Sequence, residues 1–460
     1  MDLFYAYVNK HQDDFVQKLK EVVAIKSVSS DPSLRDEVFK MGAWLHREME
    51  RLGASTKIVE LGLQEGENPG LKLPPVILVY GHYDVQPALK EDGWNTDPFV
   101  LTEDSSHRLI GRGSTDDKGP VLGWLLVIEV FRQLELEFPV NLIMCFEGME
   151  ESGSEGLDDV INREAEGFFK GTDAVCISDN YWLGKTKPSL TYGLRGVSYF
   201  HVTVKGPKAD LHSGVFGGTV HEPMTDLIHI LGKLVSCDGK IMVPGIMNQV
   251  APVTEEEESS YNGLEFSMDT LHEALGAKNS IHSNVKDTLM HRWRFPSLSI
   301  HGIEGAFYSP GEKTVIPAKV TGKFSIRTVP DMDPDNVTQL VVQHIESEFT
   351  KLKSKNTISI KCVGAGKPWC SSFNHWNFVA GRKAVEKVFN QSPDLTREGG
   401  SIPVTLTFEN ALKKNVLLLP MGACDDGAHS INEKLDRRNF IEGIKLLGTY
   451  LDELRQIQAE

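Results

Sequence analysis

The sequence of 460 residues contains no run of apolar residues that is long enough to cross a bilayer. Positive charge is also scarce, because 64 acidic residues outnumber 48 basic ones and the formal net charge is −16. An acidic surface repels nucleic acid and anionic membranes, so we expect neither as a partner. The first residues lack a basic segment followed by an apolar one, so we expect a cytoplasmic protein.

Several motifs of other enzyme classes are also missing. The sequence has no Walker loop, no Gly-x-Gly-x-x-Gly fingerprint and no Gly-x-Ser-x-Gly elbow, so nucleotide-dependent enzymes and serine hydrolases have no support. The six cysteines lie far apart, and Cys362 and Cys370 are too widely spaced for a zinc ribbon. We therefore expect reduced, buried thiols.

Hydrophobic residues make up 40% of the chain, and their spacing predicts an α/β fold. Short, continuous apolar runs are typical of strands buried on both faces, and they occur at residues 76–80, 140–146, 174–177 and 416–419. Helical spacing is found at residues 3–25, 35–52, 120–136 and 437–456, whereas residues 62–75 are predicted to form a loop. We expect a mostly parallel mixed sheet between helices.

The middle of the chain has a different pattern. Apolar residues alternate with polar ones around Phe200 and again around Phe324, which is typical of sheets with one face in water. We expect an inserted α+β lid and dimerisation domain at residues 192–370, with a helix at residues 223–235. The catalytic domain is then discontinuous and comprises residues 1–191 and 371–460. The acidic run at residues 255–258 is predicted to be a solvated loop.

Carboxylates and histidines follow the predicted strands or occupy loop ends, where open α/β sheets bind their ligands. Five segments carry them: His82 with Asp84, Asp116 with Asp117, Glu150 with Glu151, Asp179, and residues 425–429, which end in His429. Each segment alone is more often a cap or a turn than a ligand. Glu150 and Glu151 alone would favour an acidic helix N-terminus. The coincidence of five segments favours a metal site.

The donor types in these segments indicate which ions would bind. Imidazole together with carboxylate suits Zn²⁺ or Mn²⁺ better than Ca²⁺ or Mg²⁺. Two ions need a shared ligand, and a bridging aspartate would hold them roughly 3.5–4 Å apart, so that both polarise one water and one carbonyl group. Of two adjacent glutamates, one can coordinate metal while the other carries a proton. The pattern predicts a two-metal hydrolase.

Longer segments of the sequence resemble the M20 metallopeptidases and, more narrowly, the cytosolic non-specific dipeptidases related to carnosinase. The resemblance rests on residues 80–87, 111–120, 147–154 and 178–182, and extends to 211–214, 313–317 and 397–403. It implies five metal ligands: His82 and Asp179 for one ion, Glu151 and His429 for the other, and Asp116 as the bridge. It also implies a cis peptide bond between Asp116 and Asp117.

The resemblance further implies a mechanism. Asp84 would accept the ring N–H of His82 and orient this ligand. Glu150 would be the general base, which takes a proton from the metal-bound water and later gives it to the leaving amine. The resulting metal-bridging hydroxide would attack the peptide carbonyl.

His212, in the inserted domain, would by the same resemblance reach the site of the partner subunit and stabilise the oxyanion, so a homodimer would belong to the mechanism. Arg327 should leave the packed face of its strand, where a guanidinium suits a substrate carboxylate. Without the resemblance, a solvated arginine and an ordinary loop histidine would be the simpler interpretations. The implied substrate contacts are Glu150, Asp179, His212, Thr314, Arg327, Ser401 and His429.

The sequence departs from the family pattern at two places. Relatives usually have a loop and a strand before the segment at Tyr80, but here Leu78 runs through Val79 directly into Tyr80. Either one strand does the work of two, or the sequence comes from a shortened isoform or a faulty gene model. Gly364 stands where we expect a histidine in relatives, which predicts one weaker contact with the substrate carboxylate.

The leading hypothesis is a dipeptidase that hydrolyses L-dipeptides, for example Cys-Gly, with two divalent ions. One alternative is an M20 aminoacylase or a tripeptide-cleaving enzyme, which differs in whether the pocket requires both free termini. Another alternative is an inactive relative kept for dimerisation, against which the intact ligand segments argue.

Overall fold

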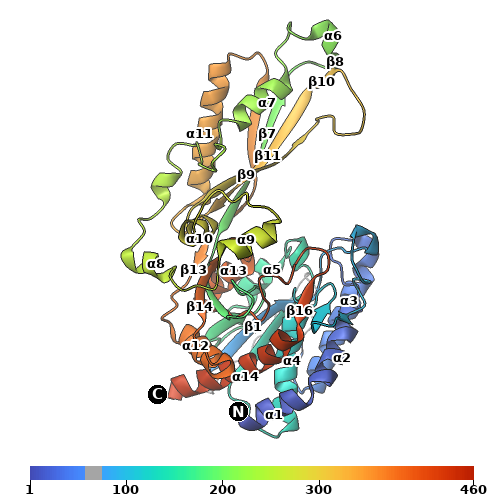
Figure 1. The fold of residues 1–460 in the computed structure, drawn as a ribbon, viewed down its shortest axis with the longest axis vertical. Coiled ribbons are helices and arrows are strands. Elements are labelled where there is room, and N and C mark those ends of the chain that lie inside the picture. Colours follow the sequence, from blue (N-terminus) through green and yellow to red (C-terminus); the bar gives the residue numbers. More distant parts are fainter. Residues whose placement is uncertain (57–74, 460) are drawn as a thin grey trace.

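The computed structural model describes residues 1–56 and 75–459 and shows an elongated molecule with two principal sheets (Figure 1). Most of the predicted loop at residues 62–75 lies outside the described residues. Among the helices that are described, none combines the length and the apolar character that a membrane span requires.

The larger sheet has seven strands in the order β13-β6-β15-β5-β1-β4, with β14 paired to β6. Strand β1 pairs in parallel with β4 and β5, β15 pairs in parallel with β5, and β14 pairs in parallel with β6. Of the strands that the structure describes in this sheet, β13 and β15 pair antiparallel with β6, so the predicted mostly parallel mixed sheet is confirmed. The strands are β1 (Val76–His82), β4 (Asn141–Glu147), β5 (Ala174–Ile177), β6 (Ser189–Leu194), β13 (Trp369–Cys370), β14 (Asp394–Glu398) and β15 (Val416–Leu418).

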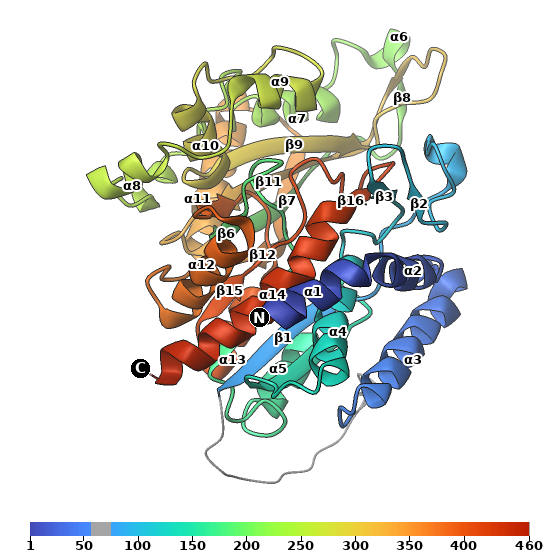
Figure 2. The same cartoon turned by 60° about the horizontal axis from the view of Figure 1, so that its bottom comes forward.

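Helices cover both faces of this sheet, and Figure 2 shows α1, α4 and α14 side by side. Six helices contribute to the apolar core on one face: α1 (Asp2–Lys10), α2 (Gln12–Val23), α3 (Arg35–Arg51), α4 (Lys118–Gln133), α12 (Trp376–Phe389) and α14 (Arg437–Ala459). Two lie on the other: α5 (Leu157–Glu164) and α13 (Pro403–Leu412). Short 3₁₀ helices are η1 (Pro32–Leu34), η2 (Lys90–Asp92), η3 (Glu150–Ser152) and η4 (Met247–Gln249).

The prediction of one helix over residues 3–25 is wrong. The chain leaves helical geometry at His11, where φ is −105° and ψ is 22°, and this residue separates α1 from α2. Val8 and Phe15, on either side of the break, are both buried in the same core. Because the apolar spacing continues across the break, the periodicity did not reveal it.

Strand β1 occupies the interior of the sheet despite its shortened lead-in. Ile77 and Val79 pack into the core on one face, whereas Leu78 and Tyr80 pack into the core on the other. All four side chains are at most 1% exposed. A single strand therefore fills the position between β5 and β4 and carries His82 at its end.

The second sheet is antiparallel, with the order β12-β7-β11-β9. Phe200, Val202, Phe324 and Ile326 form one buried face with two helices. The intervening residues of β7 are at least partly exposed, as the alternation predicts, whereas in β11 Lys323 and Arg327 are partly exposed but Thr321 and Ser325 are buried. The elements are β7 (Gly196–Lys205), α7 (Pro223–Leu231), β9 (Ser297–Glu304), β11 (Lys319–Thr328), α11 (Pro334–Leu352) and β12 (Thr357–Gly366). Its far end carries β8 (Leu211–His212), α6 (Ser213–Phe216) and β10 (Val315–Ile316) (Figure 1).

The prediction of a solvated loop at residues 255–258 is wrong, because α8 (Glu255–Ser260) forms there. Thr254 caps the helix by accepting the N–H of Glu257. The Glu257 carboxylate lies 2.7 Å from Arg294 Nε and 3.1 Å from Arg397 Nη2. These cationic partners are distant in sequence, so a local pattern could not identify them. Two further helices, α9 (Met268–Leu275) and α10 (Val285–Trp293), follow α8.

All six cysteines are free, but the expectation that they are buried is wrong for most of them. Only Cys176 is fully buried, and Cys145 and Cys362 are half-buried. The exposed ones are Cys237, Cys370 and Cys424. Apolar runs surround Cys145 and Cys176, whereas each of the three exposed cysteines is followed directly by Ser or Asp, so the expectation of burial did not extend to them.

The chain changes sheets between Leu194 and Gly196 and again between Gly366 and Trp369. These positions lie close to the expected boundaries at residues 192 and 370. We propose that the inserted segment is a separate folding unit, because its apolar cluster is distinct from those on the larger sheet.

Replacing Phe324 with alanine tests this division. The Phe324 ring is fully buried and stacks on Phe200 at a centroid distance of 5.0 Å. We expect Phe324→Ala to lower the free energy of unfolding of the inserted unit by about 3–5 kcal/mol. Differential scanning calorimetry should show one transition moving to lower temperature while the other stays in place. A single transition that moves as a whole would contradict separate units.

Candidate metal centre

Three of the five candidate ligands lie at or just beyond the carboxyl ends of neighbouring strands in the larger sheet, and the other two lie in loops. His82 is the last residue of β1, and Asp179 follows β5. Glu151 lies in η3, just beyond the end of β4. Asp116 lies just before α4, and His429 lies in the loop between β15 and β16 (Lys434–Asp436). Parallel strands end at one edge of the sheet, which is why segments far apart in sequence meet there.

The five candidate ligands form two groups that share Asp116. Nε2 of His82 lies 3.1 Å from Asp116 Oδ1 and 3.6 Å from Asp179 Oδ1. Nε2 of His429 lies 3.1 Å from Asp116 Oδ2 and 3.1 Å from Glu151 Oε2. Within each group the three candidate donor atoms lie within 4.8 Å of one another. Asp116 thus presents one carboxylate oxygen to each group, and these nitrogen and oxygen donors fit divalent cations.

Negative charge is concentrated around these groups. Burial raises the pKa of Glu150 to about 8; His82 lowers it, while the carboxylates of Asp179 and Glu151 raise it further. Burial also raises the pKa of Asp179 to about 6. Contacts with Asp116 and Glu151 raise the pKa of His429 to about 10. Protons therefore take the place of cations in the metal-free protein, and cation binding would displace them.

Asp84 supports the turn that carries the two glutamates. Its carboxylate accepts the backbone N–H groups of Glu150 and Glu151, at 3.2 and 3.1 Å. Nδ1 of His82 lies 3.1 Å from the Asp84 backbone oxygen and 3.5 Å from its Oδ1. The sequence predicted the contact with His82 but missed the support of the turn. Glu150 and Glu151 also begin the short 3₁₀ helix η3, so the alternative interpretation of an acidic helix N-terminus describes the same two residues.

Gln86 is a further contact that sequence reasoning missed. Its Nε2 donates to Oε2 of Glu151 at 2.8 Å. His82, Asp84 and Gln86 stand at alternate positions of one segment, and in extended backbone such positions share a side. That spacing was the signal that could have identified Gln86.

The backbone around Asp116 and Asp117 packs closely on the end of β1. The peptide bond between them is cis, as the resemblance implies. Asp117 Oδ2 accepts the backbone N–H of His82 at 3.1 Å. At Gly81, a Cβ would lie 2.8 Å from Asp117 Oδ2 and 2.6 Å from Val121. Only glycine at position 81 therefore allows Asp117 and Val121 to pack this closely against β1.

Arg327 and Ser401 are also in contact. Arg327 lies in β11 of the second sheet, and Ser401 follows β14 of the larger sheet. Arg327 Nη1 donates to Ser401 Oγ at 3.1 Å. Arg327 leaves the face that buries Phe324 and Ile326, as the alternation predicts. Burial lowers the pKa of its half-buried guanidinium. Among the described residues no carboxylate forms an ion pair with it.

His212 and Thr314 are not brought to the candidate ligands within one subunit. His212 belongs to β8, Thr314 directly precedes β10, and both are exposed at the far end of the smaller sheet (Figure 1). Gly364 is exposed beside a register shift in β12, and a Cβ there would meet no atom within 4 Å.

Comparison with known proteins agrees with this arrangement. A model of the peptidase family M20/M25/M40 matches residues 78–453. The chain belongs to this family. It is 54% identical to the Cys-Gly metallodipeptidase dug1 of Schizosaccharomyces pombe, with 99% of each chain covered. It is 44% identical to the Beta-Ala-His dipeptidase of Homo sapiens, with 99% of this chain and 93% of that protein covered.

Solved structures of relatives share the fold. The chain superposes with a TM-score of 0.89 on a structure of the di-peptidase Dug1p from Saccharomyces cerevisiae, at 50% identity, covering 99% of this chain and 98% of that one. Human carnosine dipeptidase 1 gives a TM-score of 0.88 at 44% identity, with 98% of each chain covered. The predictions of an M20 metallopeptidase, of its α/β fold and of dipeptide hydrolysis are confirmed.

A third acidic group in this M20 chain differs from the two ligand groups. It consists of Asp425, Asp426 and Asp436, whose oxygens also lie within 4.8 Å of one another. Lys434 Nζ lies 2.8, 2.7 and 2.9 Å from these three carboxylates. Because a lysine ammonium already occupies the centre, this group is an ion-pair cluster rather than a cation site.

Metal addition should separate the two kinds of cluster. We expect Mn²⁺ to raise the melting temperature of the EDTA-treated protein, since a ligand at a hundred times its Kd stabilises by about 2.7 kcal/mol. Asp116→Ala should remove most of this increase, because Asp116 belongs to both ligand groups. Asp436→Asn should keep it, because Lys434 neutralises the third cluster. Differential scanning fluorimetry provides the measurement, and equal responses of the two variants would contradict the assignment.

Proposed function

We propose that this M20 enzyme hydrolyses free L-dipeptides with two divalent ions, Zn²⁺ or Mn²⁺, and that Cys-Gly is among its substrates. The observation that carries the two-ion proposal is the carboxylate of Asp116, whose two oxygens face different histidines. The substrate proposal rests on relatives that are named as Cys-Gly metallodipeptidases at 52–55% identity. A cytoplasmic location remains a prediction.

The charges of the site fit two divalent cations. Asp116, Asp179 and Glu151 supply three negative charges as ligands, and Glu150 adds a fourth beside them. His82 and His429 add neutral nitrogen donors when they bind metal. When bound, the two ions polarise the substrate carbonyl and lower the pKa of a water molecule.

Glu150 is the residue that we propose moves the proton. Its carboxylate lies in a buried environment that favours proton uptake, since burial raises its pKa. It would accept a proton from the attacking water and donate it to the leaving amine. Asp84 holds the backbone N–H of Glu150, so the position of this base is fixed from the end of β1.

Arg327 and Ser401 form the proposed site for the free C-terminal carboxylate of the dipeptide. The guanidinium is half-buried and forms no ion pair with a described carboxylate. A substrate carboxylate would supply the missing negative charge and accept hydrogen bonds from Arg327 Nη1 and Ser401 Oγ. This requirement for a free carboxylate distinguishes a dipeptidase from enzymes that act on internal peptide bonds.

We further propose that the active form is a homodimer. His212 and Thr314 lie far from the candidate ligands of their own subunit, which supports a role in the site of the partner subunit (Figure 1). Val215 and Phe216, beside His212, are 66% and 39% exposed. Exposed apolar side chains at this end of the lid favour burial against a second copy of the chain.

Replacing Glu150 with glutamine tests the proton transfer. We expect Glu150→Gln to lower kcat for Cys-Gly by about 10²–10⁴-fold, because the amide cannot accept a proton from water. The bound metal, counted by mass spectrometry, should stay at the wild-type level. Glu155→Gln is the matched control, since Glu155 is exposed on the same loop.

Wild-type activity in Glu150→Gln, or loss of metal together with activity, would contradict the role of the base. The same assay should include N-acetylated amino acids and tripeptides. Faster cleavage of either would favour the aminoacylase or tripeptidase alternative. A wild-type protein that binds two ions but cleaves none of these substrates would favour the inactive relative.

Mixing two inactive variants tests the role across subunits. We expect His212→Ala to lower turnover without removing metal. Random pairing of His212→Ala subunits with Glu150→Gln subunits should recover about a quarter of wild-type turnover, because half the dimers then have one complete site. Turnover of the re-equilibrated mixture is the measurement. If His212 acts within its own subunit, mixing recovers nothing.

A further inference from the structure

A small third sheet brings Glu433 against the loop that carries Asp116. It consists of β16 (Lys434–Asp436), β3 (Arg108–Ile110) and β2 (Thr102–Glu103), in that order. Lys434 pairs with Ile110 in an antiparallel ladder. Glu433 directly precedes β16, whereas residues 111–116 directly follow β3. The ladder therefore continues, and the Glu433 carbonyl accepts the N–H of Gly111 at 2.9 Å.

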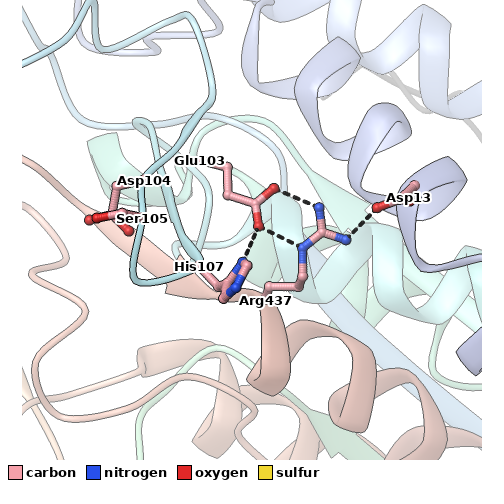
Figure 3. Close-up of a pocket in the computed structure, with 6 residues that line it drawn as sticks. All are labelled: Asp13, Glu103, Asp104, Ser105, His107 and Arg437. Carbon is pink, nitrogen blue, oxygen red and sulfur yellow. Dashed lines mark hydrogen bonds and ion pairs between the residues drawn. The ribbon is translucent and has the colours of Figure 1, made fainter.

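The opposite end of this sheet is tied by a different glutamate. Arg437 Nε and Nη2 donate to the two oxygens of Glu103 at 2.8 and 2.6 Å. Figure 3 shows this pair, with Asp13 and His107 beside it, in a surface pocket of about 580 Å³. Arg437 pairs with both Asp13 and Glu103 in this pocket, whereas Asp104 pairs with Arg108, and none of the lining residues is a candidate ligand. The pair therefore fixes the sheet at the surface, away from the Asp116 loop.

The Glu433 side chain, in contrast, is fully buried and holds the Asp116 loop by its backbone. Oε1 accepts the N–H groups of Gly113, Thr115 and Asp116 at 3.0, 3.1 and 3.2 Å. Oε2 accepts from Arg112 Nη1 at 2.6 Å. A buried carboxylate needs such compensation, and four donors supply it.

Two more contacts join the same loop to the segment of His429. Arg112 Nη2 donates to the Ser430 backbone oxygen at 3.0 Å. Thr115 Oγ1 donates to Asp426 Oδ2 at 2.8 Å. Ser430 directly follows His429, so the Arg112–Glu433 pair contacts two of the three chain segments that supply ligands to the second group, those of Asp116 and His429. These segments lie more than 300 residues apart in sequence, and their relative position depends on such contacts.

We infer that Glu433 is a positioning residue that sets the distance between Asp116 and His429, and thereby the affinity of the shared centre for divalent cations. The inference rests on the proposed two-ion function. A centre that binds cations needs its donors held within about 0.5 Å of productive geometry, and residues behind the ligands provide that precision. Neither Glu433 nor Arg112 touches the substrate or an ion in this role.

Glu433→Gln removes the charge at nearly constant volume. The amide oxygen can still accept backbone N–H groups, but the amide nitrogen would face Arg112 and leave a buried guanidinium without its carboxylate. We expect the affinity for Mn²⁺ to fall by about 10–100-fold, as is typical when a group behind a metal ligand is removed. Turnover at saturating Mn²⁺ should return toward wild type, because the ligands and Glu150 are all present.

The measurement is a calorimetric titration of the metal-free, folded protein with Mn²⁺, together with the Mn²⁺ dependence of dipeptide turnover. Two glutamates give matched controls. Glu103→Gln breaks an arginine pair in the same small sheet, and Glu453→Gln alters a buried glutamate of α14 that is paired with Lys387. Both controls should bind Mn²⁺ as wild type does.

Wild-type affinity in Glu433→Gln, or an equal loss in the controls, would overturn the inference. If Glu433→Gln does not fold, Arg112→Lys takes its place, since lysine can keep the charge but cannot bridge Glu433 and Ser430 together. A reduced Mn²⁺ affinity of folded Arg112→Lys supports the inference, and an unchanged affinity overturns it. A wild-type protein that binds no Mn²⁺ would instead contradict the proposed function.

Discussion

The main constraint on this structure is the repulsion between the carboxylates that converge around Asp116, because the surrounding residues must compensate their negative charge. Asp179, Glu150 and Glu151 all face this buried residue, and their negative charges can coexist only if protons or cations compensate them. In the metal-free protein, the raised pKa values of Glu150 and His429 favour proton binding, which offsets part of this negative charge. The site is built on the ends of the buried strands β1 and β5 together with the loops that carry Asp116 and His429.

The two principal sheets have different roles in the molecule. The larger sheet places the candidate ligands at its strand ends and buries the apolar residues of β1 on both faces. The smaller sheet has one face packed against α7 and α11 and extends to β8 and β10, which lie far from the ligands (Figure 1). In the proposed dimer, the length of this sheet allows His212 to reach the site of the partner subunit. The shape of the lid is then a requirement of the chemistry.

Sequence patterns predicted most of this fold because the signals were local. Continuous apolar runs identified β1, β4, β5 and β15, and alternation identified the buried face of β7 and β11. The failures have different causes. The break at His11 was missed because the apolar spacing continues across it, whereas the ion pairs of Glu257 were missed because its two arginine partners are distant in sequence.

By itself, the sequence determined the donor types, the family and the spacing that sets Asp84 two residues after His82, whereas the contact of Gln86 with Glu151 came from the structure. Only the tertiary structure decided which oxygen of Asp116 faces which histidine. It also decided that Glu433, more than 300 residues away in sequence, accepts backbone hydrogen bonds from the Asp116 loop. The reason is physical. Composition and spacing fix what a residue can donate or accept, whereas its partner is chosen by the packing of strands and helices that meet only in the folded chain.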